Sequence, residues 1–333
     1  DPANWIASPL TPGPSPGKPN SITLASPDPV VVALAVSQSL DGNRLIRSFQ
    51  PVHIECALSA LDAVKDAAVE WFVDTLAPPY QSTATNRLVR SGTGHDARFE
   101  TELPGHPNRT LVRYRIVADL GKGFQVLSPR PDDAFRWHSY FVTPTRPQST
   151  NVVYDILISK ESLRILKTNI ASEPKRVVVP DPPGALRASW NATQPAVFVH
   201  DGKVWDIQFR HHGSEYRREE SRRSYKLRFP DYDLFLGQDS LFVTDKDYRT
   251  ETGHALTRAA GLPSSKTRWV DLYFNENPKL IRLEQEEQNE QLLERWESEQ
   301  IGLHGSIPGG TGGLFFKAMG VSTTAGEGPF GPG

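Results

Sequence analysis

The residues best suited to chemistry lie in one strand–loop–strand segment, between Arg210 and Arg228. Seven of its residues are Lys or Arg and three are Glu, which gives a local excess of four positive charges. The loop has a small-residue turn at Gly213 and Ser214, and Lys226 follows it. Backbone N–H groups of such a turn, with a following lysine, can bind phosphate oxygens. A solvated basic hairpin explains the same residues without a ligand.

This segment is the first of five landmarks along the second half of the chain. The others are Asp247 with the helical stretch 257–263, the strand 267–273, Leu283-Glu284-Gln285 with Leu292-Leu293, and Gly313-Leu-Phe-Phe-Lys317-Ala. In this order the landmarks resemble the spore-coat-protein-H (CotH) kinase-like family. The resemblance implies an atypical protein kinase that uses ATP with Mg²⁺ or Mn²⁺ to phosphorylate serine on a protein substrate.

Phosphoryl transfer needs cationic groups on the phosphates and carboxylates for the metal and the nucleophile. The resemblance then gives these nucleotide-binding candidates: Lys226, Lys317, Glu284, Arg210, Gly213 and Ser214. Glu284 would orient a lysine as its ion-pair partner or lie near the nucleotide. Alternatively, Glu284 is simply one of the charged residues of an acidic helix, and this interpretation has equal weight.

The chain departs from the family pattern at three points. Glu215-Tyr216 stands where the family has another small hydroxyl residue, and Arg223 stands where lysine is common. The stretch 275–280 replaces a Gly-rich turn. In the family, the catalytic and metal-binding Asp residues lie well downstream, so we expect them beyond Gly333. No catalytic residue is therefore assigned, and this polypeptide by itself is not expected to be a competent kinase.

Other groups of ligand-type residues lack the spacing of a site. Asp245, Asp247 and Glu251 lack the remaining oxygen ligands and the Gly of a calcium loop. His211 and His212 are adjacent, so on a strand they point to opposite faces and make a poor metal pair. The sequence therefore predicts no metal site.

Composition narrows the class of partner. Lys+Arg number 37 and Asp+Glu 39 in 333 residues, a formal net charge of −2, so no global basic field points to nucleic acid or an anionic membrane. No apolar run of about 18 residues predicts a transmembrane segment. The single cysteine, Cys56, excludes an internal disulfide, and alternation along 52–58 predicts that it points into a core.

The near-neutral net charge of the chain combines a basic segment with an acidic one. Residues 284–299 hold seven Glu against Arg295, an excess of six negative charges. If this segment and the basic segment 210–228 face one cleft, the balance reflects a phosphate site beside acidic groups. If they do not, each is a solvated face.

The first half of the chain has the pattern of strands. Residues 52–58 and 112–118 alternate with period two, and several short strands recur between residues 30 and 146. This spacing predicts an antiparallel β-sandwich that resembles a fibronectin type III or immunoglobulin-like module. We interpret it as a spacer or adhesive module.

From residue 151 the pattern mixes strands with helices. A strand at 154–159 runs into a helix with Ser162 as its predicted N-cap, and Asp201-Gly202 predicts a two-residue hairpin turn. We therefore expect an α+β domain over residues 151–320 that resembles the N-terminal part of an atypical protein-kinase-like fold.

Both ends have a Pro- and Gly-rich composition. Residues 1–29 read as a linker, and through Trp5, a Thr-Pro-Gly stretch and Pro19-Asn20 they also resemble the end of a lamin-tail-like domain. Residues 321–333 predict a flexible end. Because the chain begins at Asp1 and its one Met is Met319, we expect a piece of a longer protein, with any signal peptide upstream.

These features support two functions. The first is an exported bacterial multidomain protein, extracellular or at the cell surface, that carries an atypical kinase domain and acts on a protein substrate. The second is a non-catalytic surface or matrix protein, in which the kinase-like fold serves as an interaction module for cell-surface or matrix partners. The residues that follow Gly333 distinguish the two.

Overall fold

The chain folds into two compact units. The computed structural model describes residues 31–37, 45–58, 64–77, 83–92, 98–172, 179–180, 183–185, 192–213, 223–245 and 248–304. The units divide between Thr145 and Arg146, and the segment Thr75–Tyr80 belongs to the second. The predicted end segments 1–29 and 321–333 lie outside the described residues.

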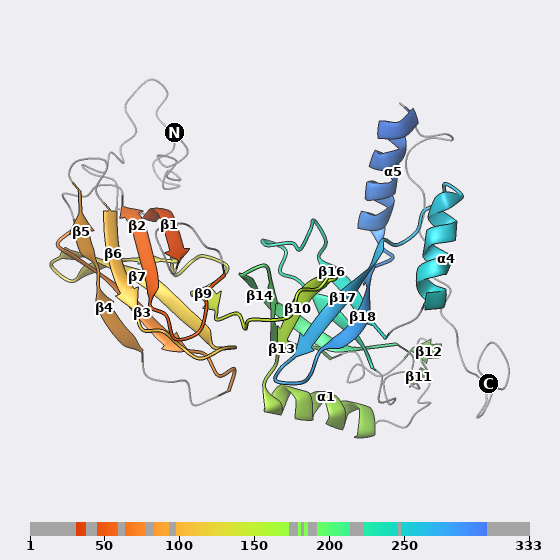
Figure 1. Cartoon of the computed structure of the whole chain (residues 1–333), viewed down its shortest axis with the longest axis horizontal. Coiled ribbons are helices and arrows are strands. Elements are labelled where there is room, and N and C mark those ends of the chain that lie inside the picture. The colour runs from red at the N-terminus through yellow and green to blue at the C-terminus, as the bar shows by residue number, and fades with distance from the viewer. Residues whose placement is uncertain are drawn as a thin grey trace. The chain divides into compact units, whose positions relative to one another are not determined.

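The first unit consists of two antiparallel sheets (Figure 1). One has the strand order β1-β2-β6-β5, formed by Val31–Ser37, Val52–Leu58, Arg98–Leu103 and Val89–Ser91. The other has the order β4-β3-β7-β8, formed by Ala84–Arg87, Asp66–Val73, Leu111–Gly121 and Phe124–Ser128, and β9 (His138–Phe141) also pairs with β7. Both sheets contribute side chains to one hydrophobic core.

Alternation along β2 and β7 fills that core. Ile54 and Cys56 of β2 and Ile116 of β7 are each at most 1% exposed. The prediction that Cys56 points inward is confirmed. Burial, with Glu55 adding to it, raises the pKa of the Cys56 thiol to about 12. The thiol is therefore a packing group, because a nucleophilic cysteine needs a lowered pKa.

The second unit is a closed barrel of seven strands in the order β10-β13-β14-β15-β16-β18-β17. The strands span Val152–Leu157, Gln194–His200, Lys203–His212, Ser224–Arg228, Ser240–Thr244, Leu280–Glu286 and Thr267–Phe274. The parallel pairing of β10 with β17 closes the ring, whereas the other neighbours are antiparallel. The short strands β11 (Val179–Pro180) and β12 (Pro183–Ala185) pair separately. The described residues are thus mostly β-sheet, and the kinase-like α+β arrangement expected for residues 151–320 stays a prediction.

Aromatic side chains dominate the barrel interior. Tyr154, Phe198 and Phe209, from three different strands, have no exposed surface. Phe235, from the loop after β15, packs its ring 5.0 Å from that of Phe198 and 5.2 Å from that of Phe229. This loop therefore contributes to the barrel core.

Three helices accompany the barrel in the described residues: α1 (Lys160–Ser172), α4 (Tyr248–Ala259) and α5 (Glu290–His304). None of them is both long and apolar enough to cross a membrane. The predicted N-cap at Ser162 is wrong, because the helix begins one turn earlier and the Ser159 hydroxyl accepts the Ser162 backbone N–H at 2.9 Å. The serine nearer the end of β10 caps the helix.

Two local predictions are confirmed. Asp201 and Gly202 both have positive φ, 48° and 76°, and join β13 to β14 as a two-residue hairpin. The helix expected to end near residue 260 is α4, and Gly261 follows it with φ 75°. The backbone N–H of Leu262 reaches back to the carbonyl of Thr257 at 3.2 Å, which closes the helix end.

Lowering the pH should destabilise the first unit through His138. Burial lowers the pKa of this imidazole from 6.5 to about 4, against a small opposite effect of Asp133. Because the folded-state pKa is depressed, the contribution is fully present above about pH 6.5 and is lost as the pH falls towards 4. Between pH 6.5 and pH 4 we expect the free energy of unfolding to fall by about 3 kcal/mol in the wild type, and H138Q should abolish this fall. Urea unfolding at several pH values measures it, and equal pH slopes in both proteins would contradict it.

Removing the carboxylate of Asp155 should destabilise the second unit. Arg146 donates two hydrogen bonds to Asp155, of 2.8 and 2.6 Å, and its guanidinium lies 3.8 Å from the ring centroid of Tyr273. The Asp155 side chain is only 4% exposed. D155N should therefore cost about 3 kcal/mol in urea unfolding, because it leaves Arg146 without its anion.

The matched control is E161Q, which breaks the exposed Glu161–Arg164 pair on α1. That variant should unfold at the wild-type urea concentration, because exposed pairs add little stability. An equal effect of D155N and E161Q would contradict the importance of the buried pair.

Candidate phosphate-binding site

The outer surface of the barrel carries a row of three side chains on neighbouring strands. Arg210 of β14 lies opposite Lys226 of β15, and Lys226 lies opposite Phe242 of β16. The chain neighbours Phe209 and Leu227 are buried in the barrel core, so alternation turns the row outward. Two of the residues nominated from the sequence are therefore side by side.

Lys226 forms a close ion pair with Glu287, which follows the last residue of β18. The Lys226 Nζ and a Glu287 carboxylate oxygen are 2.5 Å apart, and both side chains are about four-fifths buried, at 21% and 20% exposed. The Ser240 hydroxyl donates to the other carboxylate oxygen of Glu287 and lies 3.1 Å from Asp239 Oδ1. These contacts fix the position of the ammonium group.

Arg210 adds a second, poorly solvated cation. Burial lowers the pKa of its guanidinium, and Glu287 opposes that effect. One guanidinium N–H donates to the backbone carbonyl of His211 at 3.1 Å. A partly desolvated cation gains more from an anionic ligand than a solvated one does. Arg210 and Lys226 are balanced by Glu287 and Asp239, so these four groups carry no net charge.

A stacked pair of aromatic rings lies beside Arg210 and Lys226. The rings of His212 and Phe242 are stacked, with centroids 3.9 Å apart and planes at 16°. Lys226 Nζ lies 5.5 Å from the Phe242 centroid. His211, in contrast, is 5% exposed and points inward, so the two histidines occupy opposite faces as predicted. Phe242 is only 6% exposed, so the half-buried ring of His212 is the aromatic group of this pair that a planar ligand can reach.

The remaining candidates have different positions. Gly213 follows β14 with φ 111°, a backbone angle that favours glycine. Ser214 and Lys317 lie outside the described residues.

Glu284 points into the barrel and not to Lys226. It accepts a hydrogen bond from Arg268 Nε at 2.7 Å and another from the hydroxyl of Tyr154, which also accepts one from Arg268. Burial, followed by Glu284, raises the pKa of Tyr154. Arg268 is thus the ion-pair partner of Glu284, and the lysine's partner is Glu287.

The sequence reasoning missed Glu287, Ser240 and Asp239. Glu287 is the fourth of eight polar residues in the run 284–291, and nothing local distinguishes it from its neighbours. Because side chains alternate along a strand, Glu284 and Glu287 point to opposite faces. This alternation could have identified Glu287 once the strand was known. Asp239 and Ser240 come directly before and at the start of β16.

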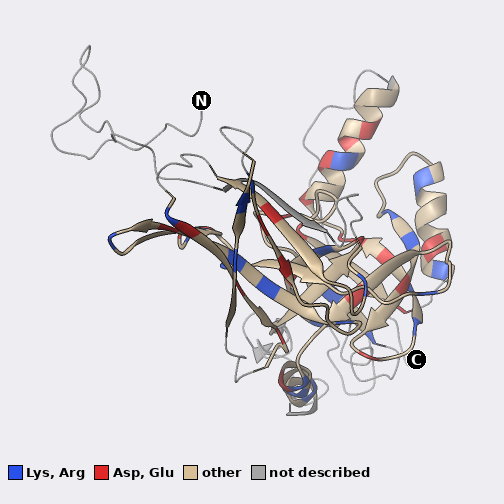
Figure 2. Cartoon of the chain, turned by 60° about the vertical axis from the view of Figure 1, so that its left-hand side comes forward, with Lys and Arg blue, Asp and Glu red and all other residues tan. Residues whose placement is uncertain are grey.

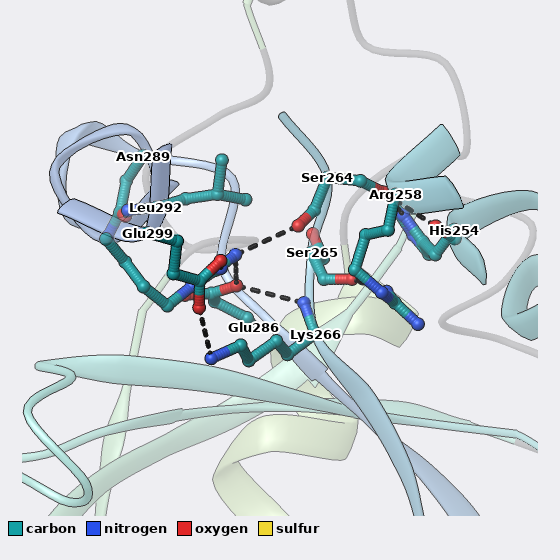
Figure 3. Close-up of polar contacts among 10 residues, drawn as sticks. His254, Arg258, Ser264, Ser265, Lys266, Glu286, Asn289, Leu292 and Glu299 are labelled. Atoms are coloured by element: carbon teal, nitrogen blue, oxygen red, sulfur yellow. Dashed lines mark hydrogen bonds and ion pairs between the residues drawn. The ribbon is translucent and has the colours of Figure 1, made fainter. Parts of the chain in front are cut away.

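A buried arginine–glutamate pair holds α5 to the end of β18, and Figure 3 shows Glu286 of this pair with Lys266 and Glu299. Arg295 of α5 makes two 2.7 Å hydrogen bonds to Glu286, whose side chain is 4% exposed. Glu286 also accepts the backbone N–H of Lys266 at 2.9 Å. Arg295 reaches Glu299 as well, and Glu299 pairs with Lys266 at 2.7 Å. The residue after Glu286 is Glu287, so the same anchor fixes the lysine's partner.

Charges of both signs are interspersed on the elements of this unit (Figure 2). The acidic segment 284–299 meets the basic segment 210–228 at the Lys226–Glu287 pair. Other glutamates of the acidic segment pair with Arg268 and Arg295. Among the described residues the two segments thus adjoin at Glu287, which pairs with Lys226 and also interacts with Arg210.

Two comparisons of the sequence with known proteins found no relative. No protein-family model matches the chain, and no curated protein matches it. The function is therefore inferred from the residues of the site and their geometry.

Removing the charge of Glu286 should loosen α5. E286Q leaves the guanidinium of Arg295 without its buried anion, so we expect a loss of about 3 kcal/mol in urea unfolding. E299Q is the matched control, because Glu299 contacts the same arginine but is 42% exposed. That variant should lose less than about 1 kcal/mol. Equal losses would show that burial of the Glu286 pair is not what stabilises α5.

Proposed function

We propose that the second unit binds ATP and belongs to an atypical, CotH-like protein kinase of an exported bacterial multidomain protein. The kinase would transfer the γ-phosphoryl group of ATP to serine on a protein substrate, outside the cell or at its surface. The observation that carries the proposal is the outward row in which Lys226 lies between Arg210 and the aromatic ring of Phe242, with Glu287 holding its ammonium group.

The geometry suits a triphosphate. Kinases hold a phosphate-binding lysine in place with a glutamate, because a fixed ammonium loses little entropy when it binds the anion. Lys226 and Glu287 have this relationship at 2.5 Å. Arg210, on the next strand, can add two parallel N–H donors to phosphate oxygens. The half-buried ring of His212, backed by the buried ring of Phe242, can stack on the adenine base.

Asp239 and Glu287 are the residues that would hold Mg²⁺ or Mn²⁺. Their carboxylates approach the same Ser240 hydroxyl, so they lie close together beside Lys226. Magnesium usually binds proteins through one or two carboxylates and takes its other ligands from phosphates and water. The ion would neutralise charge that develops on the transferred phosphoryl group.

A second function, a non-catalytic surface or matrix module, has its own support. Leu256 of α4, Leu262 and Leu303 of α5 are 67%, 56% and 72% exposed. Leu262 and Leu303 line a groove of about 480 Å³ together with Trp296. Exposed apolar side chains of this kind suit a protein partner. In this case the kinase-like unit would act in binding alone.

Nucleotide titration tests the proposal. Isothermal titration with ATP and Mg²⁺ should show binding that K226A weakens at least tenfold, because the lysine supplies a charge-assisted contact to phosphate. R210A should weaken it as well. K203A is the matched control, since Lys203 also lies in the barrel and pairs with Asp233 at 2.5 Å, far from the row along β14.

A radiolabelled γ-phosphate assay on a chain extended beyond Gly333, where the catalytic and metal-binding carboxylates are expected, then separates the two functions. Binding followed by transfer to protein serine supports the kinase, whereas binding without transfer supports the non-catalytic module. Affinity for ATP that is unchanged in both K226A and R210A would contradict the site.

A further inference from the structure

The outer face of the first unit holds a separate group of potential metal ligands, which is independent of the nucleotide proposal. His53 and Glu55 of β2 lie two residues apart, so both point outward, and Glu100 of β6 lies beside them. His53 Nε2 is 3.9 Å from Glu55 Oε2 and 3.6 Å from Glu100 Oε2. One ligand atom from each residue falls within 4.8 Å of the other two.

The strand register sets like charges against one another. Glu55 is directly opposite Glu100, and Glu102 is directly opposite His53. Like charges in directly opposed positions destabilise an antiparallel pair. Arg98 offsets part of this, since its Nε lies 3.7 Å from Glu55 Oε1. The other oxygen of Glu55 faces the imidazole, so the carboxylate has one oxygen left for a cation.

The His53 side chain is 16% exposed, but its Nε2 atom is buried. Its Nε2 exposes less than 1 Å² and has no hydrogen-bond partner among the described residues. The nitrogen is aimed at the two carboxylates, whose side chains are 35% and 37% exposed. A buried imidazole nitrogen normally has a hydrogen bond or a metal, because desolvation without either is costly.

We propose that His53, Glu55 and Glu100 bind a divalent transition-metal ion of the Zn²⁺ class. Zinc binds imidazole nitrogen and carboxylate oxygen at about 2.0–2.2 Å, and three protein ligands with one water form a common open site. Ligands of such a tetrahedral ion are roughly 3.3 Å apart. The present separations of 3.6 and 3.9 Å need only small side-chain adjustments.

The ion would link β2 to β6 and relieve the repulsion between Glu55 and Glu100. Its fourth position would face solvent, where water or a carboxylate or imidazole of a partner protein can bind. The imidazole distinguishes this class of ion from Ca²⁺ and Mg²⁺, which prefer all-oxygen ligands.

The experiment titrates Zn²⁺ into the full, untagged chain and measures binding by competition with a chromogenic chelator. Wild type should bind one Zn²⁺ that H53Q and E100Q each weaken at least tenfold, and saturating Zn²⁺ should raise its melting temperature by several degrees. E102Q is the matched control, because it removes one negative charge from the same face of β6 outside the three ligands. It should keep the wild-type affinity.

Three outcomes would overturn the proposal. The first is equal Zn²⁺ affinity in wild type, H53Q and E100Q. The second is Ca²⁺ binding as tight as Zn²⁺ binding and unaffected by H53Q, which would mean a carboxylate-only cation site. The third is no Zn²⁺-dependent difference in melting temperature between wild type and H53Q, with both proteins folded by circular dichroism.

Discussion

Closure of the barrel through the parallel pair β10–β17 is the constraint on which the second unit depends. A closed sheet has an inner and an outer face. Successive side chains along each strand therefore point alternately into the barrel and out of it. Lys226 and Arg210 fall outside, next to one another, while Glu284 falls inside with Arg268. Whether a charged strand residue belongs to the outer candidate site or to an inner ion pair therefore depends on whether its position along the strand is odd or even.

Charges on the inner side need partners. Arg268 binds Glu284, Arg282 binds Asp245 at 2.6 Å, and Arg295 binds Glu286. Such pairs add little net stability compared with apolar residues, but each is costly to break. Their geometric effect is greater: the Glu286 pair fixes α5 and the end of β18, which in turn presents Glu287 to Lys226.

The first unit follows the same parity rule with a different result. Along β2, Ile54 and Cys56 enter the core, whereas His53 and Glu55 remain on the outer face. Packing thus uses one set of residues and leaves the other for chemistry at the surface. A residue-type search alone favours the cysteine, but burial makes its thiol unreactive and makes the outer imidazole the better ligand.

By itself the sequence determined the local features: the alternation of β2, the Asp201-Gly202 turn, the end of α4 at Gly261 and the opposite faces of His211 and His212. These depend on neighbours within a few residues, where steric and hydrogen-bonding preferences act directly. Only the tertiary structure decided that Glu287 pairs with Lys226 and that Glu284 pairs with Arg268 and Tyr154. Tyr154 and Glu284 are 130 residues apart, and their meeting depends on barrel closure and strand register, which no local pattern encodes.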